Sequence, residues 1–207
     1  IAQDWERDNP RDYLYAGCAK GADVAAWKQA ARAELASAHT LAYAHSLLDM
    51  VKAFERVPHN VLAREAAALG YPLWLLRLSL ATYRLQRVVR VGVVYSGTAV
   101  ATRGITAGSG FATTELRVML VRLVDRASSV HPSVTPTVFV DDISAEATGS
   151  DEHVTVHVVG FTLLTCEAIV ADGMELSDKK CMCTASSDKL GKAVEAGLSM
   201  YNIKYTR

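Results

Sequence analysis

The sequence has few cysteines and no long uninterrupted apolar run, and both shortages narrow the class of protein. Four cysteines in 207 residues are too few and too scattered for the disulfide framework that small secreted domains use, so a reducing compartment is expected. No apolar run reaches the roughly 18 to 20 residues that span a bilayer, and no signal peptide is recognisable. We therefore expect an intracellular protein, nuclear or cytoplasmic, with no membrane partner.

Net charge is also lacking, because 22 basic residues balance 22 acidic ones. Polyphosphate backbones favour a basic protein surface, so this balance is a mild argument against a nucleic-acid partner. The chain is 50% hydrophobic and 21% charged, which is typical of one globular domain with a sizeable core. No repeat, linker or low-complexity stretch indicates a second domain.

Two adjacent carboxylates are the most informative feature that is present. The β-branched and aromatic run Val138-Phe139-Val140 ends on Asp141 and Asp142, which predicts a strand that delivers both to a tight turn. Side by side the two charges repel, and a divalent cation is the usual remedy. The alternative is a pair of solvated turn residues.

A second strand-like run ends on Asp49 and supplies a third carboxylate. Asp49 with Lys52-Ala53-Phe54 and Val57-Pro58-His59 resembles motif A of reverse transcriptases of the non-LTR retrotransposon type, and Phe139-Val140-Asp141-Asp142 resembles motif C. Arg103 to Phe111 is similar to motif B, and Leu176-Ser177-Asp178-Lys179-Lys180 is similar to the lysine-bearing motif D. Four motifs in family order over residues 43–184 are more specific than any one of them.

The resemblance implies an α+β polymerase palm, in which an antiparallel sheet carries the catalytic aspartates and packs on helices, with part of the fingers. It implies an RNA-directed DNA polymerase, a nucleotidyltransferase of a retroelement with an RNA template, a DNA primer and deoxynucleoside triphosphates as partners. Two Mg²⁺ ions, for which Mn²⁺ can substitute, would stabilise the attacking and leaving oxygens. The implied ligands are Asp49, Asp141 and Asp142 with the Met50 carbonyl.

Further residues take roles from the same resemblance. Phe54, next to Ala53, is implied to lie beneath the incoming sugar and to exclude a 2′-hydroxyl, whereas simple core packing is the alternative. Lys180 is implied to donate a proton to, or neutralise, the pyrophosphate leaving group; Lys179 competes for this role, and a solvated surface turn is as good an explanation of both. The implied nucleotide-binding residues of motif B are Ala107, Gly108 and Ser109.

The chain also departs from the family pattern. Ala107 stands where the family has glutamine, which removes an amide donor and acceptor near the nucleotide. Tyr15 to Asp23 keeps the glycines of a fingers stretch without its arginines. We expect residues 1–207 to be a palm with partial fingers, lacking the N-terminal fingers and the C-terminal thumb and inactive in isolation. The alternative is a decayed or repurposed palm that binds nucleic acid or a protein partner.

Periodicity and turn residues predict the elements around these motifs. Helices are predicted over residues 25–35, 59–69, 72–84, 111–127, 151–171 and 188–200. Strands are predicted over 41–48, 136–140, 143–147, 181–184 and 203–205, with a hairpin of 87–94 and 97–102 turning at 95–97.

Other candidate sites are weaker. Cys181-Met182-Cys183 lacks a second pair for zinc, and alternation in a strand explains it. His153 and His157 lie one helical turn apart without an evident third ligand, so histidines at the edge of the core are the better interpretation. The aromatic residues Tyr71, Trp74 and Tyr83 could stack on bases, although their helical setting favours core packing.

Overall fold

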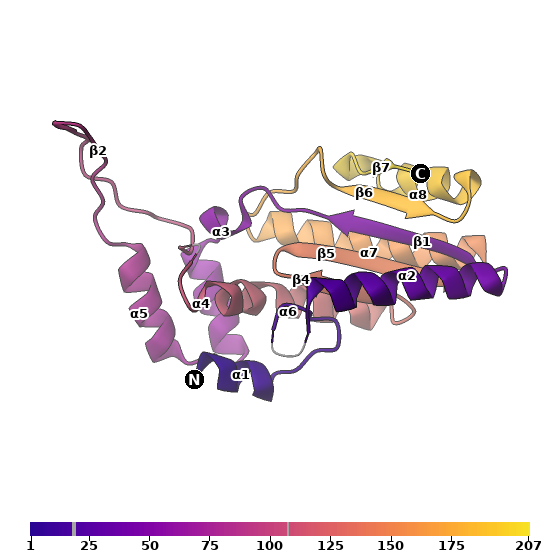
Figure 1. Cartoon of the computed structure of the whole chain (residues 1–207), viewed down its shortest axis with the longest axis horizontal. Helices are drawn as coiled ribbons and strands as arrows, with labels where there is room; N and C mark the ends of the chain where they lie inside the picture. Colours follow the sequence, from indigo (N-terminus) through magenta and orange to yellow (C-terminus); the bar gives the residue numbers. More distant parts are fainter. Residues whose placement is uncertain (18–19, 107) are drawn as a thin grey trace.

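The computed structural model describes residues 1–17, 20–106 and 108–207 (Figure 1). Its helices are α1 (Ala2–Asp8), α2 (Ala22–Ala38), α3 (Ala53–Arg56), α4 (His59–Ala68), α5 (Leu73–Tyr83), α6 (Ala112–Val130), α7 (Asp151–Ala171), α8 (Asp188–Gly197) and the 3₁₀ turn η1 (Ser199–Tyr201). Its strands are β1 (Ala42–Leu48), β2 (Arg90–Val91), β3 (Val94–Tyr95), β4 (Thr135–Phe139), β5 (Asp142–Gly149), β6 (Met182–Ala185) and β7 (Lys204–Tyr205).

Five strands form the main sheet in the order β4-β5-β1-β6-β7. All neighbours are antiparallel except β6 and β7. β1 is the central strand: Leu48 lies opposite Ile143 of β5, and Ser46 lies opposite Cys183 of β6. The predicted α+β fold, an antiparallel sheet on helices, is confirmed.

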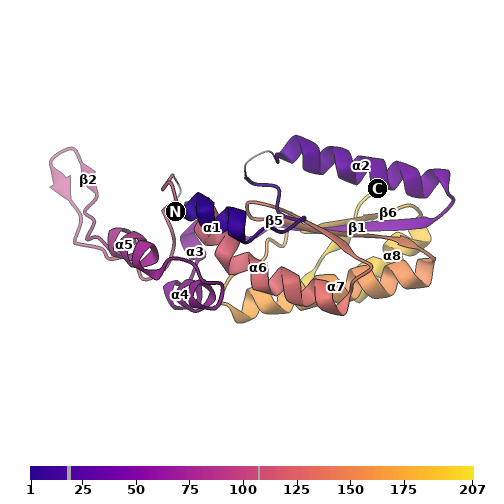
Figure 2. The ribbon, with the colours of Figure 1, turned by 90° about the horizontal axis from the view of Figure 1, so that it is seen from below.

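The sheet lies between two helical layers, with α6, α7 and α8 on one face and α2 on the other (Figure 2). Alternation along β1 directs Ala44, Ser46 and Leu48 into the core. Ser46 Oγ lies 2.7 Å from Thr162 Oγ1 of α7, so even the polar member of this face has a partner.

Helix α7 corrects the expectation that no apolar segment could span a bilayer. Its 21 residues are long and apolar enough to cross a membrane, by length and composition alone. Here its buried residues recur at helical spacing from Val154 to Ile169 and face β1, β5, α6 and α8. Such a stripe is the pattern of a core helix. Ser150 caps the N-terminus of the helix, because its Oγ accepts a hydrogen bond from the His153 amide.

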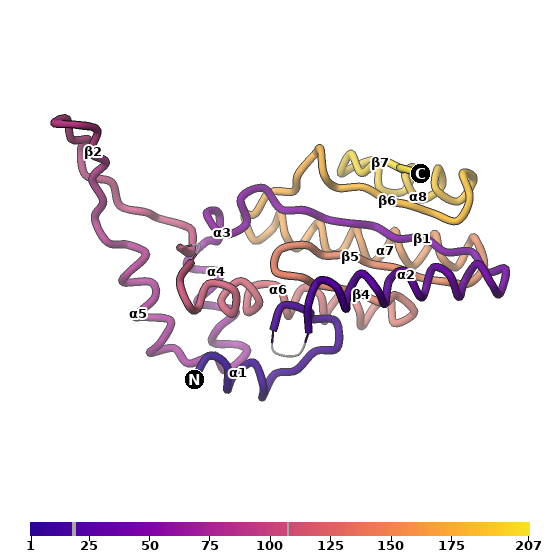
Figure 3. The backbone as a smooth tube through the Cα atoms, in the orientation of Figure 1, coloured from indigo at the N-terminus to yellow at the C-terminus, as the bar shows by residue number. Residues whose placement is uncertain are grey.

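Beyond the end of β1 the chain builds a second region from α3, α4, α5 and the β2-β3 hairpin (Figure 3). The hairpin was predicted, but its turn lies at Gly92-Val93 and not at residues 95–97. Gly92 has a φ of +61°, which the two-residue turn requires and glycine adopts at little cost. The hairpin and its flanks extend away from the rest of the molecule (Figure 1).

The two edges of the main sheet are treated differently. At β4, the amide of Tyr15 donates to the Val138 carbonyl over 2.9 Å, and the Val138 amide donates to the Tyr13 carbonyl over 2.7 Å. The segment Tyr13–Tyr15 therefore covers this edge. At the other side the sheet ends on β7, which is two residues long.

Candidate active site at the end of the central strands

The register of β1 and β5 brings Asp49 and Asp142 together. Leu48 pairs with Ile143, so Asp49, the next residue on β1, lies across from Asp142, the residue before Ile143 on the antiparallel strand. Asp141 occupies the β4-β5 turn. That turn is Val140-Asp141 and not the predicted Asp141-Asp142, because Val140 takes a φ of +57° and Asp142 already pairs with Phe139.

The electrostatics agree with this proximity. Partial desolvation, then the charges of Asp141 and Asp49, raises the pKa of Asp142 above its ordinary value, and Lys180 partly lowers it. Because Asp142 is exposed as a residue, we regard the neighbouring carboxylates as the more telling cause. The three groups form a patch of negative charge at the end of the sheet.

The motif D-like segment lies directly beside Asp49. The Ser177 amide donates to the Asp49 carbonyl over 2.8 Å, and the Val51 amide donates to the Glu175 carbonyl over 2.8 Å. The Lys180 ammonium lies 3.1 Å from Asp49 Oδ1, and its side chain is 70% exposed. Among the described ion pairs Lys179 has none, so the geometry favours Lys180 over Lys179 as the lysine of this site.

The motif B-like segment is fastened to the end of motif A by main-chain hydrogen bonds. The Gly104 amide donates to the Val57 carbonyl over 2.7 Å, and the Ile105 amide donates to the Phe54 carbonyl over 2.8 Å. Gly104 has a φ of +93°, and a Cβ on it would lie 2.6 Å from the Glu55 carbonyl oxygen. Only glycine permits this approach without a shift of the backbone.

His59, a member of the motif A-like string with no predicted role, strengthens the same junction. It is 2% exposed, its Nε2 lies 2.7 Å from the Gly104 carbonyl oxygen, and Arg84 Nε donates to its Nδ1 over 3.1 Å. With Nδ1 accepting, the proton belongs on Nε2, and the neutral ring joins α4, the motif B-like loop and α5. In the sequence, the only signal was a histidine directly after the helix-opening Pro58.

The remaining predicted site residues vary in placement. Ala53 and the Met50 side chain are buried, and Phe54 is half-buried against the core. Gly108 is exposed with a φ of +92°. Ala107 lies outside the described residues.

Ser109 is engaged with the protein itself. Its Oγ accepts a hydrogen bond from the Phe111 amide at the start of α6 and lies 3.2 Å from the Tyr83 hydroxyl. That hydroxyl also donates to the buried Glu115 over 2.7 Å. Burial raises the pKa of Tyr83 to about 12, so the phenol stays protonated and Ser109 is held in place.

Within residues 1–17, 20–106 and 108–207, no group of three or more His, Cys, Asp or Glu side chains is arranged to hold a metal ion. The donors at the end of β1 and β5 are nevertheless hard carboxylate oxygens, which Mg²⁺ and Mn²⁺ prefer. Lys180 supplies positive charge beside Asp49 in this arrangement. The residues present suit a divalent cation in their chemistry.

The cysteines and histidines that were weaker candidates for a metal site have packing partners in the structure. Cys181, just before β6, and Cys183, within it, are buried free thiols two residues apart, whereas Cys18 lies outside the described residues. His157 Nδ1 lies 3.2 Å from His131 Nδ1, and the His153 ring packs on His157.

The three aromatic residues proposed to stack on bases differ in exposure. Tyr71 and Tyr83 are buried as expected, at 1% and 2% exposed. Trp74, for which core packing was also favoured, is 58% exposed on α5.

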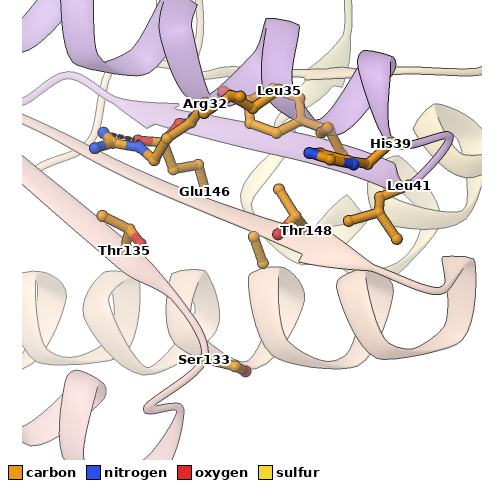
Figure 4. Close-up of a pocket in the computed structure, with 11 residues that line it drawn as sticks. Arg32, Leu35, His39, Leu41, Ser133, Thr135, Glu146 and Thr148 are labelled. Carbon is orange, nitrogen blue, oxygen red and sulfur yellow. Dashed lines mark hydrogen bonds and ion pairs between the residues drawn. The ribbon is translucent and has the colours of Figure 1, made fainter.

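A cavity of about 220 Å³ lies elsewhere, between α2 and the sheet (Figure 4). Glu146, which is 2% exposed, forms an ion pair there with Arg32 and accepts a hydrogen bond from the Tyr43 hydroxyl over 2.8 Å. Glu146 and Thr148 lie four and six residues along β5 from Asp142, which is roughly 13 and 20 Å of strand. This cavity is therefore separate from the carboxylate site.

With that geometry established, the fold can be compared with known proteins. No family model matches the sequence, and no curated protein matches it. Solved structures do match: the chain has a reverse-transcriptase-like, palm-type fold.

Two of these structures are telomerases from Candida tropicalis. The apo enzyme truncated from the C-terminal domain aligns with a TM-score of 0.61 at 11% identity, over 90% of this chain and 39% of that chain. The telomerase in complex with a TWJ fragment of telomeric RNA aligns with a TM-score of 0.62 at 13% identity, over 89% of this chain and 32% of that chain. The present chain thus spans about a third to two fifths of those proteins.

Proposed function

We propose that this chain is the palm of an RNA-directed DNA polymerase that adds deoxynucleotides to the 3′-hydroxyl of a primer. One observation carries the proposal: four segments that resemble polymerase motifs by sequence meet at one end of a reverse-transcriptase-like sheet. Asp49 lies across from Asp142, Lys180 contacts Asp49, and the Ile105 amide is bonded to the Phe54 carbonyl.

The carboxylates would hold the metal. Asp49, Asp141 and Asp142, with the Met50 carbonyl, offer the oxygen ligands suited to Mg²⁺, and Mn²⁺ can substitute. When bound, such ions supply stabilisation of the negative charge on the attacking and leaving oxygens of nucleotidyl transfer. Partial burial, followed by the charges of Asp141 and Asp49, raises the pKa of Asp142, and a bound cation relieves the repulsion among these carboxylates.

Lys180 would serve the leaving group. Its ammonium is exposed and already beside Asp49, so it can turn toward a bound triphosphate without crossing the core. There it donates a proton to, or neutralises, the departing pyrophosphate. Lys179, the neighbouring lysine, is the competing candidate for this role.

Phe54 would select the sugar, with buried Ala53 beside it and Gly108 and Ser109 on the facing loop. The ring is half-buried, so one part packs on the core while another is available to a ligand. A bulky ring beneath the incoming sugar excludes a 2′-hydroxyl, which favours deoxynucleoside triphosphates. Ser109, held between Tyr83 and the first turn of α6, would define the other wall.

We further propose that the polymerase belongs to a retroelement of the non-LTR type, with a divergent motif B at Ala107. An RNA template and a DNA primer are its partners, inside the cell in the nucleus or cytoplasm, without a membrane. This assignment is supported by the Asp49 to His59 and Leu176 to Lys180 strings.

Primer extension tests the proposal. The protein at its full natural length is supplied with Mg²⁺ or Mn²⁺, deoxynucleotides and a primer on an RNA or a DNA template. Extension on RNA is expected, with a loss of about 10²- to 10³-fold or more in Asp141→Asn because transition-state charge is no longer stabilised. Asp12→Asn, an exposed aspartate away from the site, is the matched control and keeps full activity.

Binding of the primer–template without extension would contradict the proposal. A folded protein that binds the primer–template but extends it with neither metal would indicate a palm that has lost catalysis. The nucleic-acid-binding or protein-binding alternative would then replace the polymerase.

A further inference from the structure

The net charge of zero conceals an uneven distribution of charge. Residues 66–114 contain five arginines, no lysine and none of the 22 acidic residues, so the rest of the chain carries a net charge of −5. The five are Arg77, Arg84, Arg87, Arg90 and Arg103. Every charged side chain in these 49 residues is therefore positive.

This basic stretch contains the most exposed segment of the chain, residues 84–103, which we call the arm. Every residue from Arg84 to Val100 is exposed. Between its two ends the arm is braced by its own ladder, in which Arg87 and Ala99 exchange two 2.9 Å main-chain hydrogen bonds and the Ser96 amide donates to the Val89 carbonyl. Figures 1 and 2 show it standing clear of the body.

The arginines of this region have no acidic partner. Among the described residues, eight arginines elsewhere form ion pairs with carboxylates, whereas none of the five in residues 66–114 does. Outside this stretch, Arg126 is the only described arginine that also forms no ion pair with a carboxylate. No carboxylate among the described residues neutralises these five guanidiniums, so their positive charge is available to a ligand.

Two exposed aromatic rings accompany that charge. Tyr95 on β3 is 61% exposed, and the Arg90 guanidinium lies 5.5 Å from its ring centroid. Trp74 on α5 is 58% exposed and lies three residues before Arg77, so the two share a face of the helix. Aromatic rings interleaved with arginines suit bases and phosphates together.

We propose that the arm and the exposed face of α5 bind the sugar–phosphate backbone of a nucleic acid, as an extended site beyond the carboxylates. The inference rests on the proposed function for the identity of its ligand. Each guanidinium can make paired hydrogen bonds to a phosphate, and neutralised phosphates release counterions. From Arg84 to Val91 the arm reaches roughly 23 Å, the length of about seven nucleotides of one strand.

The position of the arm fits this role. Its second flank continues into Arg103 and Gly104, the segment bonded to the end of motif A. A strand that lies in the carboxylate site and continues past the motif B-like loop therefore meets a surface whose only charged side chains are arginines. The negative patch at Asp49, Asp141 and Asp142 repels phosphates, and the arm offsets that repulsion at a distance.

Two variants with equal loss of charge test the proposal. The arm variant carries Arg77→Gln, Arg87→Gln and Arg90→Gln, which spare Arg84 at His59 and Arg103 at motif B. The control carries Lys189→Gln, Lys192→Gln and Lys204→Gln, on exposed lysines of α8 and β7. Binding of a fluorescein-labelled RNA–DNA primer–template is measured by anisotropy in EDTA between 50 and 200 mM salt, so that catalysis plays no part.

The arm variant is expected to bind at least tenfold more weakly, and the slope of log K against log salt is expected to fall in magnitude by about 2 to 3, near one unit per lost phosphate contact. The control is expected to stay within about threefold. Equal weakening of both variants would reduce the effect to net charge and overturn the proposal. Unchanged binding by the arm variant would also overturn it and would leave an acidic protein as the partner of the arm.

The two proposals fail separately. Wild-type protein that binds through the arm in EDTA yet never extends a primer would refute the polymerase and keep the arm site. Metal-dependent extension with no effect of the arm variant on affinity or salt slope would refute the arm site and keep the polymerase. Equal unfolding midpoints of the three proteins exclude misfolding as the cause.

Discussion

The body of the sheet and the arm use the same residue types in opposite ways. In the body Val154 and Val158 are fully buried and the Glu146 carboxylate has two partners, Arg32 and Tyr43. In the arm Val91 and Val93 are 74% and 88% exposed, and no arginine is paired with a carboxylate. The body is stabilised by its own contacts, whereas an isolated two-stranded hairpin is marginal in water and depends on what it meets.

The largest expected difference in the free energy of unfolding comes from making a leucine-to-alanine substitution once in the body and once in the arm. Leu116 on α6 is fully buried and Leu85 at the base of the arm is 60% exposed. Leu116→Ala is expected to lower the free energy of unfolding by about 2–5 kcal/mol through lost burial and a residual cavity. Leu85→Ala is expected to change it by about 0.5 kcal/mol or less. Urea unfolding measures both, and similar losses would mean that the arm packs on the body.

The next test concerns paired charge in the body. Arg32→Met leaves Glu146 buried without its cation; because the Arg32 side chain is 28% exposed, we expect a loss of about 2 kcal/mol, below the usual range for a buried pair. Adding Glu146→Gln should recover part of that loss. A double variant as unstable as the sum of the singles would show that the pair is not coupled.

The junction between the two regions gives a third test. Gly104 and Gly108 both have φ near +90°, but a Cβ on Gly104 meets the Glu55 carbonyl, whereas no described atom lies within 4 Å of one on Gly108. Gly104→Ala is expected to cost about 2–3 kcal/mol and Gly108→Ala about 1 kcal/mol, since only the first adds a clash to the backbone strain. Equal costs in thermal unfolding would contradict the clamp between motifs A and B.

The smallest effect concerns the negative patch. The pKa of Asp142 is raised above its ordinary 3.8, so the folded state binds more protons than the unfolded state just above that pH, and stability falls as pH rises through this window. Asp142→Asn should therefore gain a few tenths of a kcal/mol over wild type as pH rises from about 3.8, a value kept small by solvent screening. A gain that is constant from pH 3 to 7 would exclude repulsion as its cause.

The sequence predicted most of the body and less of the region beyond it. Strand β1, helices α6 and α7 and the β4-β5 hairpin follow from alternation and helical spacing. The β4-β5 turn was predicted one residue late, since Val140 adopts a positive φ that β-branched residues rarely take. The arm turn was misplaced because two glycines, Gly92 and Gly97, competed, and only the structure assigns the left-handed φ to Gly92.

The residue types of the candidate site could be predicted from the sequence, but their proximity follows from the strand register. The pairing of Leu48 with Ile143, which brings Asp49 opposite Asp142, joins residues about a hundred positions apart and has no local signal. The contact of Lys180 with Asp49 is equally remote. His59 went unrecognised because its two partners come from separate segments. The metal ions, substrates and roles assigned to these residues stay predictions.

The covered edge of the main sheet bears on how the protein behaves at high concentration. Unpaired edge strands are templates on which other chains can polymerise into aggregates. Here Tyr13–Tyr15 occupies the main chain of Val138, and at the opposite side β7 offers only two residues. The main chain at Val138 is thus closed to strand addition and β7 offers only a short edge, whereas the β2-β3 hairpin of the arm stands exposed.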